Sequence, residues 1–137
     1  MTGVRFTAVG LLLICIAIPT FARAQNPGKR DYLDYCSSCH GTDGRGNGYA
    51  LKAMPGLVPS DLTTLAKRNG GQFPSDRVRD AIDGRRPLPG HQEHETDMPV
   101  WGLQFQEQGR EFSSESEAKV SGRIDAMVSY IRSMQRE

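Results

Sequence analysis

The chain has few of the features that mark a membrane-spanning or nucleic-acid-binding protein. Its longest apolar run, residues 8–18, has 11 residues, whereas a helix needs about 20 to cross a bilayer. Charge is nearly balanced, with 17 basic and 16 acidic residues, so there is no excess of positive charge to attract nucleic acid. No run of alternating or β-branched residues predicts a strand. These absences favour a small all-α protein.

The apolar run has the layout of a secretory signal peptide. Arg5 precedes it, and Ala22 and Ala24 have the small side chains of an A-x-A cleavage site. We expect cleavage after Ala24, which removes residues 1–24 and leaves residues 25–137 as one domain without a membrane anchor. Export from a bacterial cytoplasm by such a signal predicts a periplasmic protein.

Cysteine is scarce, because the mature chain retains only Cys36 and Cys39. A disulfide between them would close a loop too short to restrain the unfolded chain. A thioredoxin-like redox pair would need a preceding strand. The segment before Cys36 instead predicts a helix, with Asn26 as its N-cap and Pro27 at its first position.

Zinc is the main rival to haem as an explanation of these cysteines, since C-x-x-C is half of many zinc sites and His91 and His94 would supply a second pair. Zinc gives no reason for His40 to follow Cys39 directly. Haem explains the whole pentapeptide CSSCH, residues 36–40. Two thiols three residues apart lie on one helical face, within reach of both vinyl groups of a porphyrin, and C-x-x-C-H is the c-type haem attachment signature.

Three features of the mature chain, in this order, resemble the class I c-type cytochromes. Gly28, Tyr32 and Cys36 match the family's spacing before C-x-x-C-H, DMPVWG at 97–102 resembles its Met-Pro ligand loop, and 124–134 resembles its closing helix. The resemblance implies a small all-α domain of about four short helices, with long loops around one haem c attached through the two cysteines.

The second axial ligand is expected to be Met98, with His40 as the first. Met98 lies 58 residues after His40 and matches the family's ligand position. Pro99 restricts Met98 to extended backbone angles, which suits a loop that holds a sulfur toward the iron. His91 and then Met54 are the reserve candidates.

Ligation by His40 and Met98 favours an electron carrier rather than an enzyme. Thioether sulfur stabilises ferrous iron, and two axial ligands leave no open position. We expect a free monomeric carrier or the electron-transfer subunit of a redox complex, with a dehydrogenase, an oxidase or another cytochrome as its partner. The alternative is a haem enzyme or ligand sensor with an open or displaceable sixth position.

Short helices are predicted in the rest of the chain. The first covers 60–70 with Ser60 as its N-cap, and the second covers 75–84 with Ser75 as its N-cap. The last begins at a capping box of Ser114 and Glu117. It places an apolar stripe at helical intervals, formed by Ile124, Met127, Val128 and Ile131, with Met134 also predicted to pack in the core. Segments 41–59 and 84–112 are expected to be mostly loops around the haem.

Several further contacts stay open from the sequence. The resemblance implies that Tyr32 and Tyr130 pack where the first and last helices cross. Trp101 is expected either to hydrogen-bond a haem propionate or to pack on the porphyrin. Arg85 and Arg86 are candidates to neutralise propionates, or they are ordinary surface residues.

The carbonyl that supports the proximal histidine is also open. Relatives commonly have Gly-Pro where this chain has Gly48-Tyr49, and that proline's carbonyl accepts a hydrogen bond from the histidine. The carbonyl of residue 49 would still serve, or the role passes to the region of Pro55 or Pro59.

Overall fold

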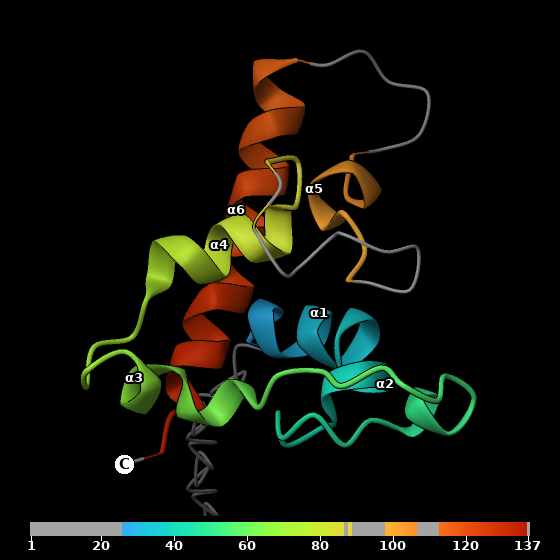
Figure 1. Cartoon of the computed structure of the whole chain (residues 1–137). Coiled ribbons are helices and arrows are strands. Elements are labelled where there is room, and N and C mark those ends of the chain that lie inside the picture. The colour runs from blue at the N-terminus through green and yellow to red at the C-terminus, as the bar shows by residue number, and fades with distance from the viewer. Residues whose placement is uncertain (1–25, 87, 89–97, 107–112, 137) are drawn as a thin grey trace, which may run out of the picture.

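The computed structural model describes residues 26–86, 88, 98–106 and 113–136, and every regular element in these ranges is a helix (Figure 1). The elements are α1 (Pro27–Tyr35), α2 (Ser37–His40), η1 (Tyr49–Lys52), η2 (Leu62–Thr64), α3 (Leu65–Arg68), α4 (Ser75–Asp83), α5 (Trp101–Gln104) and α6 (Ser114–Ser133). The predicted all-α fold is confirmed. The signal-peptide prediction for residues 1–24 lies outside the described residues, as do His91 and His94.

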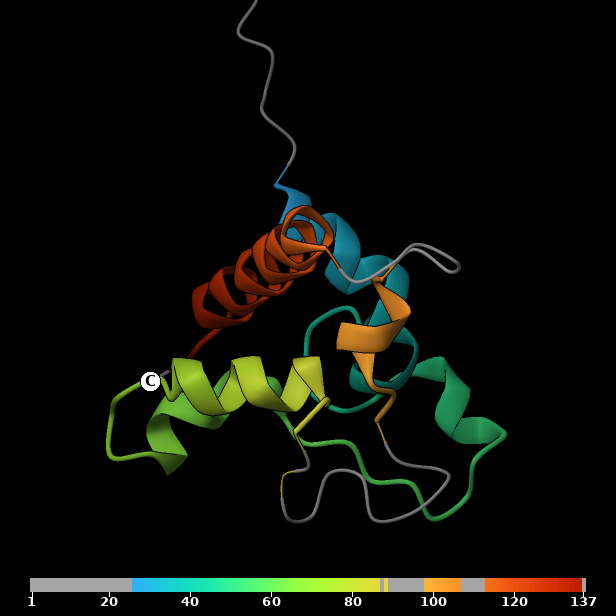
Figure 2. The same cartoon turned by 90° about the horizontal axis from the view of Figure 1, so that it is seen from above.

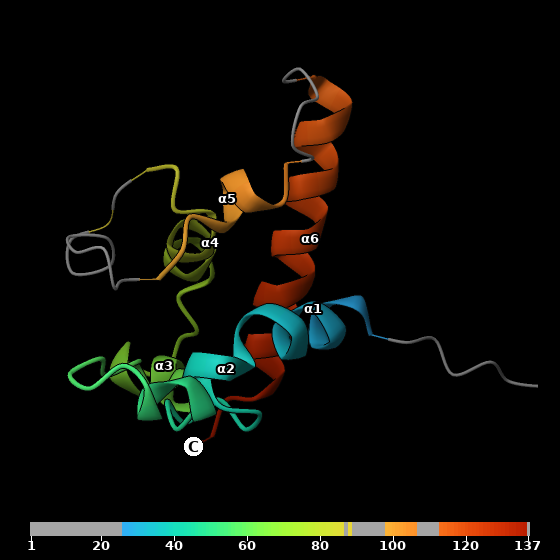
Figure 3. The ribbon, with the colours of Figure 1, turned by 90° about the vertical axis from the view of Figure 1, so that its right-hand side faces the viewer.

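The first and last helices cross in close contact, and this crossing organises the fold (Figure 3). Gly28 of α1 lies so near α6 that a Cβ added there would be 2.0 Å from the carbonyl oxygen of Ala126. The rings of Tyr32 and Tyr130 pack beside this point with centroids 5.3 Å apart. The predicted packing of the two tyrosines is therefore confirmed, and the glycine is required by the close approach of the two backbones.

The core lies between α6 and the two helices packed against it, α1 and α4 (Figure 2). Tyr32, Ile124 and Met127 are fully buried. The apolar stripe predicted on α6 faces this core, and α4 contributes Val78 and Ile82 to it. The core consists of Tyr32, Cys36, Val78, Ile82, Phe105, Val120, Ile124, Met127, Val128 and Ile131. Met134 packs against its edge, as predicted.

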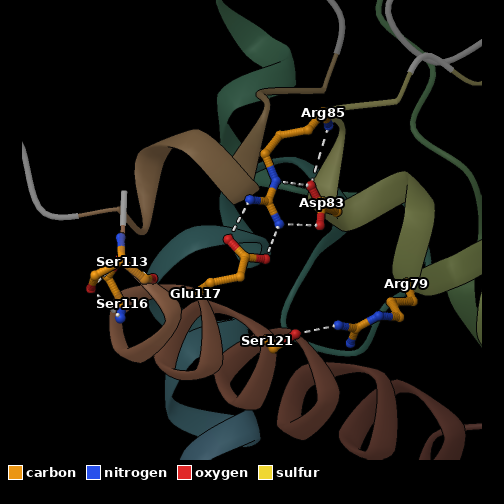
Figure 4. Close-up of polar contacts among 7 residues, drawn as sticks. All are labelled: Arg79, Asp83, Arg85, Ser113, Ser116, Glu117 and Ser121. Carbon is orange, nitrogen blue, oxygen red and sulfur yellow. Dashed lines mark hydrogen bonds and ion pairs between the residues drawn. The ribbon is translucent and has the colours of Figure 1, made fainter. Parts of the chain in front are cut away.

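Two helix N-termini differ from the prediction by one residue. Asp61, rather than Ser60, caps η2 by accepting a hydrogen bond from the amide of Thr63 at 2.8 Å. The capping box of α6 consists of Ser113 and Ser116, whose side chains Figure 4 shows at the start of that helix. In each case a neighbouring residue has an equally suitable oxygen, so sequence alone could not choose between them.

Two other helix predictions are corrected. Ser75 is the first residue of α4 and not its cap; its hydroxyl accepts a hydrogen bond from Arg132 instead. The helix predicted over 60–70 is divided into η2 and α3. Gly84 ends α4 in the left-handed conformation, at φ 68°, as predicted. Among the described residues, none of the helices is long and apolar enough to span a membrane.

Candidate functional site

An apolar pocket lies among α2, η2, α3, α4 and α6, and it brings together residues from distant parts of the chain. Its cavity volume is about 100 Å³. The lining residues are mostly aliphatic, and they are Cys36, His40, Ser60, Leu62, Leu65, Pro74, Arg77, Val78, Ala81, Ile82, Met98 and Ile131.

The cysteines and histidine of the CSSCH motif lie at the junction of α1 and α2. Cys36 ends α1 and precedes α2, and its carbonyl accepts hydrogen bonds from the amides of Cys39 at 3.2 Å and His40 at 2.9 Å. The two cysteines therefore lie about one helical turn apart along the backbone. Cys36 and His40 line the pocket, whereas Cys39 is half-buried and is not among the lining residues.

The Cys36 thiol is buried in this apolar setting, with 6% of its surface exposed. Burial, with smaller contributions from the nearby Asp31 and Cys39, raises the pKa of the Cys36 thiol to about 12. The thiol is therefore neutral at physiological pH before any covalent attachment. A neutral sulfur is compatible with an apolar cofactor beside it.

His40 is oriented by the backbone of a segment 20 residues away. Its Nδ1 atom lies 3.1 Å from the carbonyl oxygen of Ser60. Because a carbonyl only accepts, Nδ1 carries the proton in this hydrogen bond, and the lone pair of the neutral ring is then on Nε2. The supporting carbonyl left open by the sequence is thus that of Ser60, directly after Pro59, and not that of Tyr49.

The loop after α2 folds back onto the CSSCH helix and satisfies its last carbonyl groups. The amide of Gly46 donates to the carbonyl of His40 at 2.8 Å, and the amide of Gly48 donates to that of Cys39 at 3.0 Å. A Cβ at Gly48 would lie 2.0 Å from the carbonyl oxygen of Ser38. The glycine-rich sequence of this loop therefore allows it to hold the histidine from behind.

Tyr32 supports the same turn from inside the core. Its hydroxyl donates to the carbonyl of Gly41 at 2.7 Å, and burial raises the pKa of the Tyr32 hydroxyl, so the group remains a donor at neutral pH. Because Gly41 follows His40 directly, this bond connects the α1–α6 crossing to the backbone of the histidine.

Met98 is half-buried and lines the pocket together with His40, although the two residues are far apart in the sequence. It also packs against the hydrophobic core. Met54, a reserve ligand candidate, is not among the residues that line the pocket. The other reserve, His91, lies outside the described residues. Of the methionine candidates, the arrangement favours Met98.

Trp101 does not line the pocket. Its ring stacks on Phe105 with centroids 5.5 Å apart and packs at 5.4 Å against Tyr35. Arg123 covers the face of Phe105 at 4.0 Å and pairs with the buried Asp31 at 2.8 Å. This aromatic cluster joins α1, α5 and α6, so Trp101 packs between helices, and its expected contact with a haem stays a prediction.

Arg85 and Arg86, the two candidates for propionate binding, both pair with carboxylates of the protein. Arg85 lies between two carboxylates (Figure 4), with Nε 2.6 Å from Asp83 and Nη1 2.6 Å from Glu117. These hydrogen bonds raise the pKa of Arg85 and lower the pKa of both Asp83 and Glu117. Arg86 is exposed and pairs with Asp80 at 3.0 Å.

The cation that does border the pocket is Arg77, which the sequence analysis did not single out. The sequence could have indicated this position of Arg77, because Arg77 and Ala81 are four residues apart and therefore lie on one face of α4. The carbonyl of Ser60, in contrast, has no side-chain signal that a sequence could reveal.

The residues around the pocket fit a haem. Two thiols one helical turn apart, a histidine with an oriented ring, a methionine and an aliphatic lining are what a covalently attached porphyrin requires. Among residues 26–86, 88, 98–106 and 113–136, no group of three or more histidine, cysteine or acidic side chains is placed to hold a metal ion. The zinc hypothesis depends on His91 and His94, which lie outside these ranges.

Comparison with known proteins adds one match. The family model described as cytochrome c matches residues 25–135, which includes every residue of the pocket. No curated protein and no solved structure matches the chain.

Proposed function

Because the chain belongs to the cytochrome c family, whose members bind haem covalently and transfer electrons, we propose that it is a periplasmic one-electron carrier with His40 and Met98 as axial ligands. One haem c is attached through Cys36 and Cys39. The protein acts free or as the electron-transfer subunit of a redox complex.

The observation that carries this proposal is the meeting of His40 and Met98 at one apolar pocket, beside Cys36. Their separation of 58 residues means that the fold, and not local sequence, brings them together. Among the described residues that line the pocket, no other side chain ligates iron well, apart from the cysteine assigned to attachment.

Each residue has a definite part in this proposal. Bound haem supplies a one-electron iron couple whose potential is raised by a thioether ligand. The carbonyl of Ser60 holds the Nδ1 proton of His40, which fixes the ring and strengthens Nε2 as a donor. Aliphatic side chains such as Leu65 and Ile82 exclude water from the pocket.

The sequence supports the proposed location, and the redox role of the family supports the proposed class of partner. The signal-peptide layout of residues 1–24 supports export, and the partner is a dehydrogenase, an oxidase or another cytochrome. Such redox partners meet through small and weak interfaces that permit rapid dissociation. We therefore expect a monomer that docks transiently.

The test is a redox titration of the protein matured in a bacterial periplasm, together with exposure of the reduced form to carbon monoxide. A carrier shows one reversible one-electron transition, stays low-spin in both states and does not bind carbon monoxide. Rapid carbon monoxide binding or high-spin iron would instead identify the haem enzyme or sensor. Protein recovered from the periplasm with no covalent haem would refute the proposal altogether.

A further inference from the structure

Arg77 differs from every other arginine in the described part of the chain. It has no hydrogen bond, ion pair or ring contact with any described residue. Each of the others has a protein partner, and the pairs are Arg30–Asp31, Arg45–Asp43, Arg68–Asp61, Arg79–Asp125, Arg85–Asp83, Arg86–Asp80, Arg123–Asp31, Arg132–Ser75 and Arg136–Asp61.

The position of Arg77 makes this lack of a protein partner more informative. Apart from His40, Arg77 is the only described residue lining the pocket that can carry a charge at neutral pH, since the thiol of Cys36 is neutral there. It is also the third residue of α4, where the partial positive charge of a helix N-terminus disfavours a cation. Arg77 is itself exposed, so an anion at the open side of the pocket would reach its guanidinium and would also offset the unfavourable position near the helix N-terminus.

We propose that Arg77 binds a propionate carboxylate of the haem. This inference rests on the proposed function, because the haem would be the source of the anion. Haem c has two carboxylates on an otherwise apolar body, and its attachment to cysteines uses the vinyl groups and leaves the propionates available. A guanidinium binds a carboxylate through two parallel hydrogen bonds. Arg77 therefore supplies the cation that a propionate needs and that the other lining residues do not offer.

The neighbouring charged groups already have partners or lie elsewhere. On α4, Arg79 pairs with Asp125 and also contacts Ser121, and Asp80 pairs with Arg86. On the facing side of α6, the guanidinium of Arg132 lies over the ring of Phe73 at 5.3 Å and donates to Ser75. Asp76, the remaining charged residue of the first turn, is exposed like Arg77 but is not among the lining residues.

The proposal predicts the sign of an effect on the reduction potential. A propionate is negative and stabilises ferric iron, and the paired guanidinium offsets that charge. Arg77→Gln removes the offset, so the potential falls. At a fixed electrode potential the ratio of reduced to oxidised protein is expected to fall by roughly two- to tenfold, and tenfold corresponds to about 59 mV for a one-electron couple.

The experiment compares periplasmically matured holoprotein with Arg77→Gln, Arg77→Lys and the control Arg79→Gln. The control removes the same charge two residues away, from a side chain that pairs with Asp125 and does not line the pocket. The second readout is the infrared carboxylate band of haem propionates, with the propionate carboxyl carbons labelled with carbon-13 through the haem precursor 5-aminolevulinate.

The proposal expects Arg77→Gln to lower the potential and shift the labelled band. Arg77→Lys should keep most of the potential but still shift the band, because lysine cannot form the two-point contact. Arg79→Gln should change neither quantity.

A reduction potential that falls without any band shift, or falls equally in Arg79→Gln, would overturn the proposal. If Arg77→Gln does not mature, an unshifted band in Arg77→Lys overturns it. Absence of haem from the parent protein would instead refute the proposed function.

Discussion

Gly28 in α1 lies against the carbonyl oxygen of Ala126 in α6, with no space for a side chain between the two helices. The same crossing holds Tyr32, whose hydroxyl reaches the carbonyl of Gly41 directly after His40. Packing between the first and last helices is thereby connected to the backbone of the proximal ligand. Stability and the geometry of the site therefore depend on the same contacts.

Gly28→Ala is expected to lower the free energy of unfolding by about 1–3 kcal/mol, because the new methyl group forces the helices apart. The matched control is Gly122→Ala on α6, where an added Cβ has no neighbour within 4 Å. That exposed helical position should gain about 0.5–1 kcal/mol. Denaturant unfolding of both holoproteins measures the difference, and equal effects of the two substitutions would contradict the close crossing.

Tyr32→Phe should cost about 0.5–1.5 kcal/mol, because it removes the buried hydrogen bond to the carbonyl of Gly41 and leaves that carbonyl with only the amide of Gly44 as a donor, at 3.2 Å. The control is Tyr49→Phe, since Tyr49 is 76% exposed and its hydroxyl has access to water. Thermal unfolding followed at the haem absorption band and by circular dichroism compares the two. A Tyr32→Phe protein as stable as Tyr49→Phe would show that the hydroxyl does not support the turn.

Glu117→Gln is expected to lower stability at pH 7 by about 0.5–1 kcal/mol, after allowance for solvent screening of this partly exposed pair with Arg85. The folded-state pKa of Glu117 lies below the ordinary value of 4.5. The stabilisation from its pair with Arg85 is therefore fully present above pH 4.5. The contribution disappears as the pH falls through the lowered pKa.

Unfolding measured from pH 7 to pH 3 checks this dependence. The stability difference between the parent and Glu117→Gln should narrow below about pH 4.5. The control Glu115→Gln removes an exposed pair with Lys119 one turn of helix apart, and it should change little at any pH. A difference that grows toward acid pH would contradict the assigned sign.

Much of the fold was predictable because its signals are local. Asn26 and Pro27 begin α1 as expected, and the spacing of Ile124, Met127, Val128 and Ile131 identified the buried face of α6. Gly84 ends α4 because its backbone adopts a conformation that glycine permits. The capping residues of η2 and α6 were missed by one position, since adjacent serine and acidic side chains compete for the same role.

The site was less predictable where it depends on tertiary contacts. The motif containing His40 identified the ligand, but the supporting oxygen belongs to the backbone of Ser60, and every residue has such an oxygen. Arg85 was considered for the haem because it is basic, yet Glu117 from α6 binds it. That pairing joins residues 32 positions apart, and no local pattern indicates it.

The central claim is that His40 and Met98 hold the iron, and the near-infrared spectrum of the oxidised protein tests it most directly. We predict a weak sulfur-to-iron band in the parent that is lost in Met98→Ala and retained in the control Met54→Ala. The same band retained in Met98→Ala, or lost in Met54→Ala alone, would contradict the assignment of Met98 as the axial ligand.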